Sequence, residues 1–215
     1  MKLIGLGAGG HAKVVIEILQ LKGEHELVGL LDPKQELWNS ELLGIPVLGN
    51  DDLLAELYDR GVRGVFIGLG TVGENNPRRN LFLDAKEHGY QIVPAIHPQA
   101  VLSPSARVGE GLTMMAGAVV NAATSLGDNV IINTGAIVDH DCVIGNHVHI
   151  ATGARLASSV QVDEGVHIGL GASIRQSIHI GRNSVVGAGA VVVDDVPENV
   201  VVVGIPAHIL RKVQM

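Results

Sequence analysis

Every sixth residue in the second half of the chain is aliphatic or methionine. The fifteen positions are Val108, Met114, Val120, Leu126, Ile132, Val138, Ile144, Ile150, Leu156, Val162, Ile168, Ile174, Ile180, Val186 and Val192. Four residues after these anchors the side chain is mostly small or β-branched, as at Ala118, Thr124 and Ala136. Two apolar positions per hexad predict short parallel strands wound around a three-sided prism, with residues 18 apart stacked on adjacent coils. An ordinary β-sandwich is the structural alternative.

The residue directly after each anchor is often one that tolerates a positive φ. It is Gly at six positions, Asn at 121 and 133, and Asp at 139 and 163. We therefore expect left-handed backbone at these corners of the prism. Because a narrow prism accepts Ile and Val but not large rings, this fold also accounts for 2% aromatic residues beside 47% hydrophobic ones.

The first half alternates strand-like and helix-like segments. We expect strands at 2–6, 27–31, 65–68 and 91–93, and helices at 11–21, from 50 or 51 to 59, and from 76 to Gly89. The first helix should bury Val14, Val15, Ile18 and Leu21 on one side. This alternation predicts a small, mostly parallel α/β sheet of Rossmann-like type. We expect one domain at residues 1–96 and the prism with a C-terminal tail at residues 97–215.

Composition excludes several classes of protein. A net charge of −7 without a basic run argues against a nucleic-acid partner. No apolar stretch approaches the ~18 residues that a membrane span needs, and Met1-Lys2 starts no signal pattern. Cys142 is the single cysteine, which excludes an internal disulfide and fits a reducing compartment. We expect a cytoplasmic protein with no membrane partner.

Three segments resemble one enzyme family. They are the opening 7–15 (Gly-Ala-Gly-Gly-His-Ala-Lys-Val-Val), the run 133–145 (Asn-Thr-Gly-Ala-Ile-Val-Asp-His-Asp-Cys-Val-Ile-Gly) and the tail 203–207 (Val-Gly-Ile-Pro-Ala). With the hexapeptide repeats, they are similar to the sugar acyltransferases of the sialic-acid O-acetyltransferase family, which includes bacillosamine-pathway and GDP-perosamine N-acetyltransferases. The resemblance implies a homotrimer that N-acetylates a nucleotide-linked amino sugar with acetyl-CoA. It also implies a left-handed β-helix, although parallel crossovers are normally right-handed.

His140 is the candidate general base. An amine attacks a thioester only without its extra proton, and a histidine that titrates near neutrality is the usual acceptor. His140 stands two residues after its anchor, at an outward-pointing place, so we expect it to be accessible. The resemblance implies that Asp141 orients the imidazole and that Asn133 contacts the sugar near its amine. A solvated turn histidine and a corner asparagine with positive φ are the plain structural alternatives.

The resemblance also places coenzyme A in a groove between neighbouring prisms. It implies cofactor contacts from His149, Leu170, Ala188, Gly204 and Pro206. Where relatives often have Gly-Gly, this chain has Ser158-Ser159. His149 and His167 share a column on adjacent coils, but a catalytic zinc takes three protein ligands, so we expect no metal. We expect His147, which has no stacked histidine, to be solvated.

The N-terminal glycines follow a strand and precede a helix. Gly5-x-Gly7-x-x-Gly10 with Asp32 after the next strand matches a dinucleotide fingerprint, but fewer than 100 residues leave no room for a second mononucleotide half. We expect a single nucleotide, with its phosphates at Gly9, Gly10 and His11 and its base or ribose near Asp32 and Pro33. The resemblance adds Gly70 as a further contact. A role in helix packing is the alternative for the glycines.

Four other functions remain as alternatives. O-acetylation of a sugar such as sialic acid uses the same chemistry, and the residues do not separate amine from hydroxyl acceptors. A metal-dependent hydratase would need three converging histidines. A non-catalytic hexapeptide-repeat scaffold would tolerate loss of His140. An NAD-dependent dehydrogenase would bind NAD in place of a nucleotide sugar.

Overall fold

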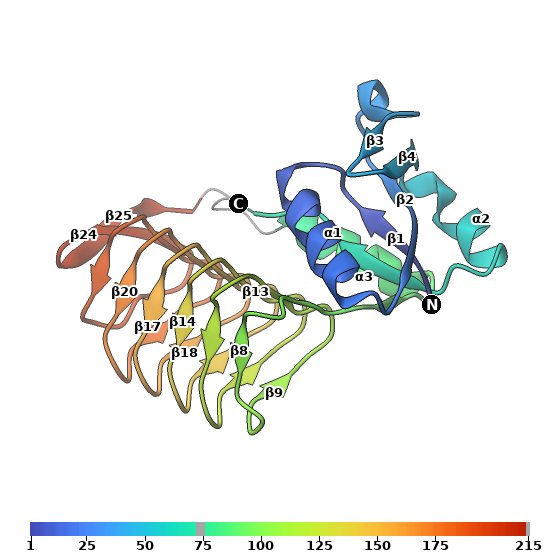
Figure 1. Cartoon of the computed structure of the whole chain (residues 1–215). Coiled ribbons are helices and arrows are strands. Elements are labelled where there is room, and N and C mark those ends of the chain that lie inside the picture. Colours follow the sequence, from blue (N-terminus) through green and yellow to red (C-terminus); the bar gives the residue numbers. More distant parts are fainter. Residues whose placement is uncertain (72–75, 214–215) are drawn as a thin grey trace. The chain divides into compact units, whose positions relative to one another are not determined.

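The computed structural model describes residues 1–71 and 76–213. Two compact units follow one another along the chain (Figure 1). One unit holds Met1–Thr71 and Pro77–Pro98, and the other extends from Gln99 onward. None of the helices in the described part of the chain has the length and apolar character needed to cross a lipid bilayer.

The first unit is a sheet with helices on both faces. Its elements are β1 (Lys2–Leu6), α1 (Gly10–Lys22), β2 (Glu26–Leu31), β3 (Glu41–Leu42), β4 (Ile45–Gly49), α2 (Leu54–Asp59), β5 (Gly64–Ile67), α3 (Asn76–Glu87), β6 (Gln91–Ile92) and β7 (Ala95–Ile96), with 3-10 turns at Gln35–Leu37 and Asp51–Leu53. The sheet order is β3-β4-β2-β1-β5-β6, and all neighbours are parallel except β3 and β4. The α/β prediction is confirmed, although the sequence did not reveal β3 and β4, because Pro46 within a short run argues against a strand.

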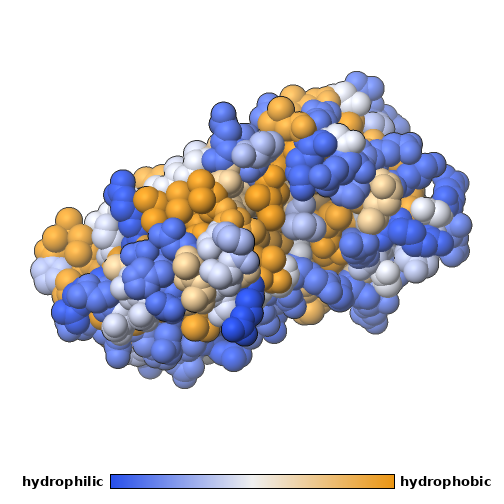
Figure 2. Space-filling view, turned by 60° about the horizontal axis from the view of Figure 1, so that its bottom comes forward, coloured by the Kyte–Doolittle hydropathy of each residue, from blue (hydrophilic) through white to orange (hydrophobic). Residues whose placement is uncertain are grey.

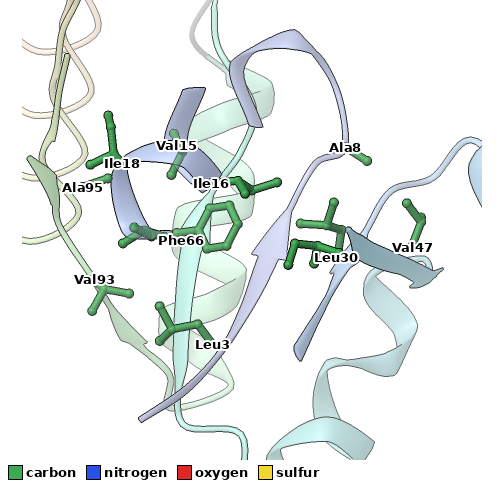
Figure 3. Packing of buried hydrophobic residues seen from close by; sticks show 12 residues of the cluster. Leu3, Ala8, Val15, Ile16, Ile18, Leu30, Val47, Phe66, Val93 and Ala95 are labelled. Carbon is green, nitrogen blue, oxygen red and sulfur yellow. The ribbon is translucent and has the colours of Figure 1, made fainter. Parts of the chain in front are cut away.

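Successive side chains of β1 point to opposite faces of the sheet and pack into two separate hydrophobic clusters. Leu3 packs with Ile18 and Phe66 in the cluster beneath α1 (Figure 3). Ile4 and its neighbours pack on the opposite face, in a second cluster that includes Phe82 of α3. Each fully buried Leu, Ile or Phe side chain stabilises the fold by about 1.5–3 kcal/mol.

The buried side of α1 differs from the predicted one. Its buried residues are Ala12, Val15, Ile16, Ile18 and Leu19, whereas Leu21 is 64% exposed. Positions 12, 15, 16 and 19 form the i, i+3, i+4, i+7 stripe of an amphipathic helix, and Leu21 falls outside it. The prediction for Leu21 was wrong.

The predicted cap at Asn50 is also absent. Asn50 precedes the 3-10 turn but makes no side-chain capping bond, since its amide donates to Asp52.

The second unit is a three-sided prism of stacked coils (Figure 1). One face holds β10 (Thr113–Met114), β13 (Ile131–Ile132), β16 (His149–Ile150), β19 (His167–Ile168), β22 (Val185–Val186), β24 (Val200–Gly204) and β25 (Ala207–Lys212). A second holds β8 (Val101–Leu102), β11 (Val119–Val120), β14 (Ile137–Val138), β17 (Arg155–Leu156), β20 (Ser173–Ile174) and β23 (Val191–Val192). The third holds β9 (Arg107–Val108), β12 (Ser125–Leu126), β15 (Val143–Ile144), β18 (Gln161–Val162) and β21 (His179–Ile180).

This unit is a left-handed parallel β-helix, and the register of its sheets shows how its coils stack. Ile132 pairs with Ile150, and Ile150 pairs with Ile168, so each rung stacks on the residue 18 positions further along. The anchors from 114 to 192 are all buried, at 5% exposure or less. Val108 is the exception at 44%, because β9 is the end strand of its sheet and has a neighbouring strand on one side only.

The left-handed corners lie at a different position from the predicted one. Positive φ recurs three residues after each anchor from Val108 to Val186, as at Gly135, Asp141 and Ser159, and not directly after it. The glycines that follow an anchor instead allow the next coil to come close. A Cβ on Gly145 would lie 2.7 Å from the Glu164 nitrogen, closer than a real contact allows.

Substituting Gly145 by alanine should therefore destabilise the prism. Forcing an extra methyl group into a packed contact costs about 1–3 kcal/mol of unfolding free energy. Arg175→Ala is the matched control, since exposed Arg175 occupies the same hexad position on another coil and its loss should cost less than about 0.5 kcal/mol. Urea denaturation measures both variants. Equal stability of the two would contradict the close-approach explanation.

Candidate active site

His140 and Asp141 form a hydrogen-bonded pair at an exposed corner between β14 and β15. Their side chains are 54% and 58% exposed, and His140 Nδ1 lies 2.7 Å from Asp141 Oδ2. Because an ionised carboxylate only accepts, Nδ1 carries the hydrogen and Nε2 keeps its lone pair. The hydrogen bond to Asp141, with the negative charges of Asp139 and Asp141, raises the pKa of His140 above its usual range. The pair can therefore accept a proton at Nε2.

Hydrogen bonds to the preceding coil fix the backbone on both sides of this corner. The Thr124 hydroxyl donates to the Asp139 carbonyl at 2.8 Å and accepts from the Cys142 N–H at 3.2 Å. Asp141 has a φ of 60° and donates its N–H to the Ala122 carbonyl at 3.0 Å. The backbone on each side of His140 is therefore held by hydrogen bonds.

Asn133 and His149 lie on another face of the prism and contact each other. The Asn133 amide nitrogen is 3.1 Å from His149 Nε2, and its Oδ1 accepts the Thr134 N–H at 2.7 Å. Asn133 has no positive φ, so the corner-residue explanation for it was wrong. His167 stacks on His149 in a T-shaped contact with ring centroids 4.8 Å apart. Burial lowers the pKa of His167.

His147 is not solvated, contrary to the prediction. It is 8% exposed, and its Nδ1 lies 3.0 Å from the Asn129 amide nitrogen. The two residues are 18 positions apart and meet on adjacent coils. Among residues 1–71 and 76–213, no group of three or more His, Cys, Asp or Glu side chains could hold a metal ion.

The predicted cofactor residues gather along a different corner from His140. Leu170 and Ala188 are exposed and follow β19 and β22, on adjacent coils. Gly204 ends β24 with a φ of 102°, and Pro206 follows in the turn to β25 after a cis peptide bond. Apolar side chains are exposed at this end of the prism, including Ile205 and Leu210 (Figure 2). One chain by itself therefore places the base and these residues at separate corners.

In the first unit, Asp32 binds the glycine-rich turn after β1. Its Oδ2 accepts the Ala8 N–H at 2.8 Å, and its Oδ1 accepts the Lys34 N–H at 3.0 Å. The carboxylate is 8% exposed, whereas Pro33 beside it is exposed. Asp32 therefore shapes the turn through backbone bonds, and Pro33 presents the accessible surface.

The glycines of β1 and of the turn that follows it have two different surroundings. A Cβ on Gly5 would lie 2.3 Å from the Phe66 ring, so Gly5 serves packing. At Gly9 and Gly10 a Cβ would meet nothing within 4 Å, which leaves the backbone at the start of α1 open to a ligand.

His11 connects this turn to the end of β5. A Cβ on Gly70 would lie 3.2 Å from His11 Nδ1, so Gly70 lets the ring approach. Arg78 Nη1 is 3.4 Å from His11 Nε2 and donates to the carbonyls of Ile67 and Leu69. Burial lowers the pKa of Arg78 to about 9. Arg78 could not be found from the sequence, because nothing in the pattern of α3 marks one of its polar residues as buried.

Two sequence families match the chain. The family described as PglD N-terminal domain matches residues 2–96, and the bacterial transferase hexapeptide family (six repeats) matches residues 123–158. A curated relative, UDP-N-acetylbacillosamine N-acetyltransferase of Bacillus subtilis, is 36% identical over 113 residues. That match covers 52% of this chain and 50% of the relative, so the chain matches about half the length of that enzyme.

Solved structures match over nearly the whole chain. PerB of Caulobacter crescentus, in complex with CoA and GDP-perosamine, is 42% identical with a TM-score of 0.88 and covers 97% of both chains. Two variants of that enzyme, with a histidine replaced by asparagine or alanine, have also been solved with the same ligands. The acetyltransferase domain of PglB from Neisseria gonorrhoeae, in complex with acetyl coenzyme A, is 40% identical with a TM-score of 0.89, covering 97% of this chain and 98% of that one. The resemblance seen in the sequence is confirmed, and the chain belongs to the PglD-type hexapeptide acetyltransferases.

Proposed function

We propose that this protein transfers the acetyl group of acetyl-CoA to the amine of a nucleotide-linked amino sugar, with His140 as general base. The observation that carries the proposal is the exposed His140–Asp141 pair, whose Nε2 is left with its lone pair. The relatives support the two substrates, since PerB was solved with CoA and GDP-perosamine and the PglB domain with acetyl coenzyme A. The acetyltransferase belongs to the cytoplasm, where acetyl-CoA and nucleotide sugars are made.

The geometry supports a direct transfer. The sugar nitrogen attacks the thioester carbon and forms the N–C bond, while Nε2 of His140 accepts the proton that the nitrogen loses. The C–S bond then breaks, and the imidazolium returns this proton to the departing sulfur of CoA. Asp141 holds Nδ1–H throughout and stabilises the positive charge on the ring. We propose Asn133 as the contact to the sugar near its amine.

The first domain, to which we assign residues 1–96, would hold the nucleotide. The backbone of Gly9, Gly10 and His11 lies at the N-terminal end of a 13-residue helix, where the helix dipole favours phosphate. Gly70 adds its backbone beside the His11 ring. We assign the base or ribose to Pro33, with Asp32 supporting the turn.

Residues 97–215 would form the acetyl-CoA site within a homotrimer. His149, Leu170, Ala188, Gly204 and Pro206 are the proposed cofactor contacts. The base lies at one corner of the prism, whereas Leu170 and Ala188 lie at another. A cyclic assembly brings different patches of neighbouring copies together, so a second copy would complete the site.

A thiol-release assay tests the function. Purified protein with acetyl-CoA should release free CoA when a UDP- or GDP-linked amino sugar is present, and not with free amino sugars or sialic acid. Release with sialic acid alone would instead support the O-acetyltransferase alternative. No release with any acceptor would contradict the proposed function.

The pH dependence of the reaction follows from the raised pKa of His140. His140 must be unprotonated to act as base, so kcat/KM should fall as the pH drops through its pKa. Because that pKa lies above the ordinary value of 6.5, the acidic limb should lie above pH 6.5. A steady-state profile from pH 5.5 to 9 measures it. A flat profile across this interval would contradict the role of His140.

A further inference from the structure

We propose that Asp139 is a second carboxylate that positions His140, and that Asn121 of the preceding coil holds Asp139 in place. The inference rests on the proposed role of His140 as base. Neither residue is among the predicted site residues, although Asp139 lies within the 133–145 motif.

A single oxygen of Asp139 connects the two coils. Its Oδ1 accepts the Asn121 amide N–H at 2.9 Å and the His140 backbone N–H at 2.8 Å. Asn121 and Asp139 are 18 residues apart, so the contact follows directly from the stacking of the coils. The bond to the main chain fixes where His140 leaves the prism, whereas Asp141 fixes the plane of its ring.

Asp139 also contributes charge. The hydrogen bonds from Asn121 and from the His140 N–H hold the pKa of Asp139 below its usual range. The group is therefore anionic wherever His140 titrates, and its charge adds to that of Asp141 in favouring the protonated imidazole.

Among the described residues, the two positions stacked directly on His140 carry no charge. Ala122 lies one coil below His140, and Ser158 lies one coil above it. Ser159, which donates its N–H to the His140 carbonyl, is also uncharged. Cys142 ends the same corner, and burial raises the pKa of its thiol, so it stays neutral.

The charge and the position of Asp139 can be tested separately. Asp139→Asn removes the charge, so an NMR titration should show the pKa of His140 lower by about 0.5 than in the unsubstituted protein. The acidic limb of kcat/KM should move to lower pH by the same amount. Asn121→Ala leaves the charge of Asp139 in place but removes the hydrogen bond that holds it. In this variant kcat should fall about 3- to 10-fold, while the pKa of His140 should shift by less than half of the shift in Asp139→Asn.

Asp163→Asn is the matched control. Asp163 follows its anchor as Asp139 does, but it pairs with His179 at 3.1 Å and not with the base. It should leave both kcat and the pKa of His140 unchanged. A His140 pKa that is identical in Asp139→Asn and the unsubstituted protein, or full kcat in Asn121→Ala, would overturn the proposal.

The NMR readout needs no turnover, so it separates this inference from the proposed function. If His140→Ala keeps full activity, the base assignment fails, while the titration still reports whether Asp139 acts on His140. If Asp139→Asn does not fold, Asn121→Ala still tests the tether.

Discussion

Replacing His140 by alanine should lower kcat about 100-fold or more while leaving the fold intact. Loss of a positioned general base typically costs this much, because the attacking amine then has to give its proton to water. His140 is more than half exposed at its corner, so its removal leaves no cavity in the prism. His140→Asn should be equally slow, because an amide is not a base. Steady-state kinetics with acetyl-CoA and the best amino sugar measure both variants.

His179→Ala is the matched control for this experiment. His179 is also exposed and pairs with a carboxylate, with Nε2 3.1 Å from Asp163 Oδ2, on the third face of the prism. Its loss should leave kcat within about twofold of the starting protein, since it makes no contact with the proposed site. If His140→Ala retained most of its activity, another residue would be the base.

Replacing Ile150 by aspartate should unfold the prism. Ile150 is completely buried and stacks between Ile132 and Ile168 in the middle of its face. An unpaired charge among aliphatic rungs costs more than the roughly 4–5 kcal/mol that marks the most damaging substitutions. We expect insoluble protein or loss of the cooperative thermal transition measured by circular dichroism.

Ile150→Val controls for the loss of volume alone. It removes one methyl group and should cost about 0.5–1.5 kcal/mol. A normal melting temperature for Ile150→Asp would show that position 150 does not point into the column.

The prism could be predicted from the sequence because its repeat is local. Each anchor from Met114 to Val192 is buried for the same reason, that two-residue strands alternate with corners at a fixed spacing. The position of the left-handed corner could not be predicted, because glycine serves two purposes. At Gly135 it adopts positive φ, whereas at Gly145 it makes room for the next coil.

The His140–Asp141 pair could also be predicted, but the hydrogen bonds that support its backbone could not. His140 and Asp141 are adjacent in sequence, so a motif reveals them. Asn121 and Thr124 come from the coil below and contact Asp139 and Cys142 only after the chain has completed a turn. Comparing polar residues at a spacing of 18 would have found this support, as it would have found the contact between His147 and Asn129.

The acceptor atom is the part of the function that the residues decide least. An amine and a hydroxyl both attack with a lone pair and both give a proton to His140. The structure of the product decides between them. With acetyl-CoA and the preferred nucleotide amino sugar, NMR and mass spectrometry should show one added acetyl group as an amide that survives hydroxylamine. A hydroxylamine-sensitive ester, or no acetylated sugar at all, would contradict the account.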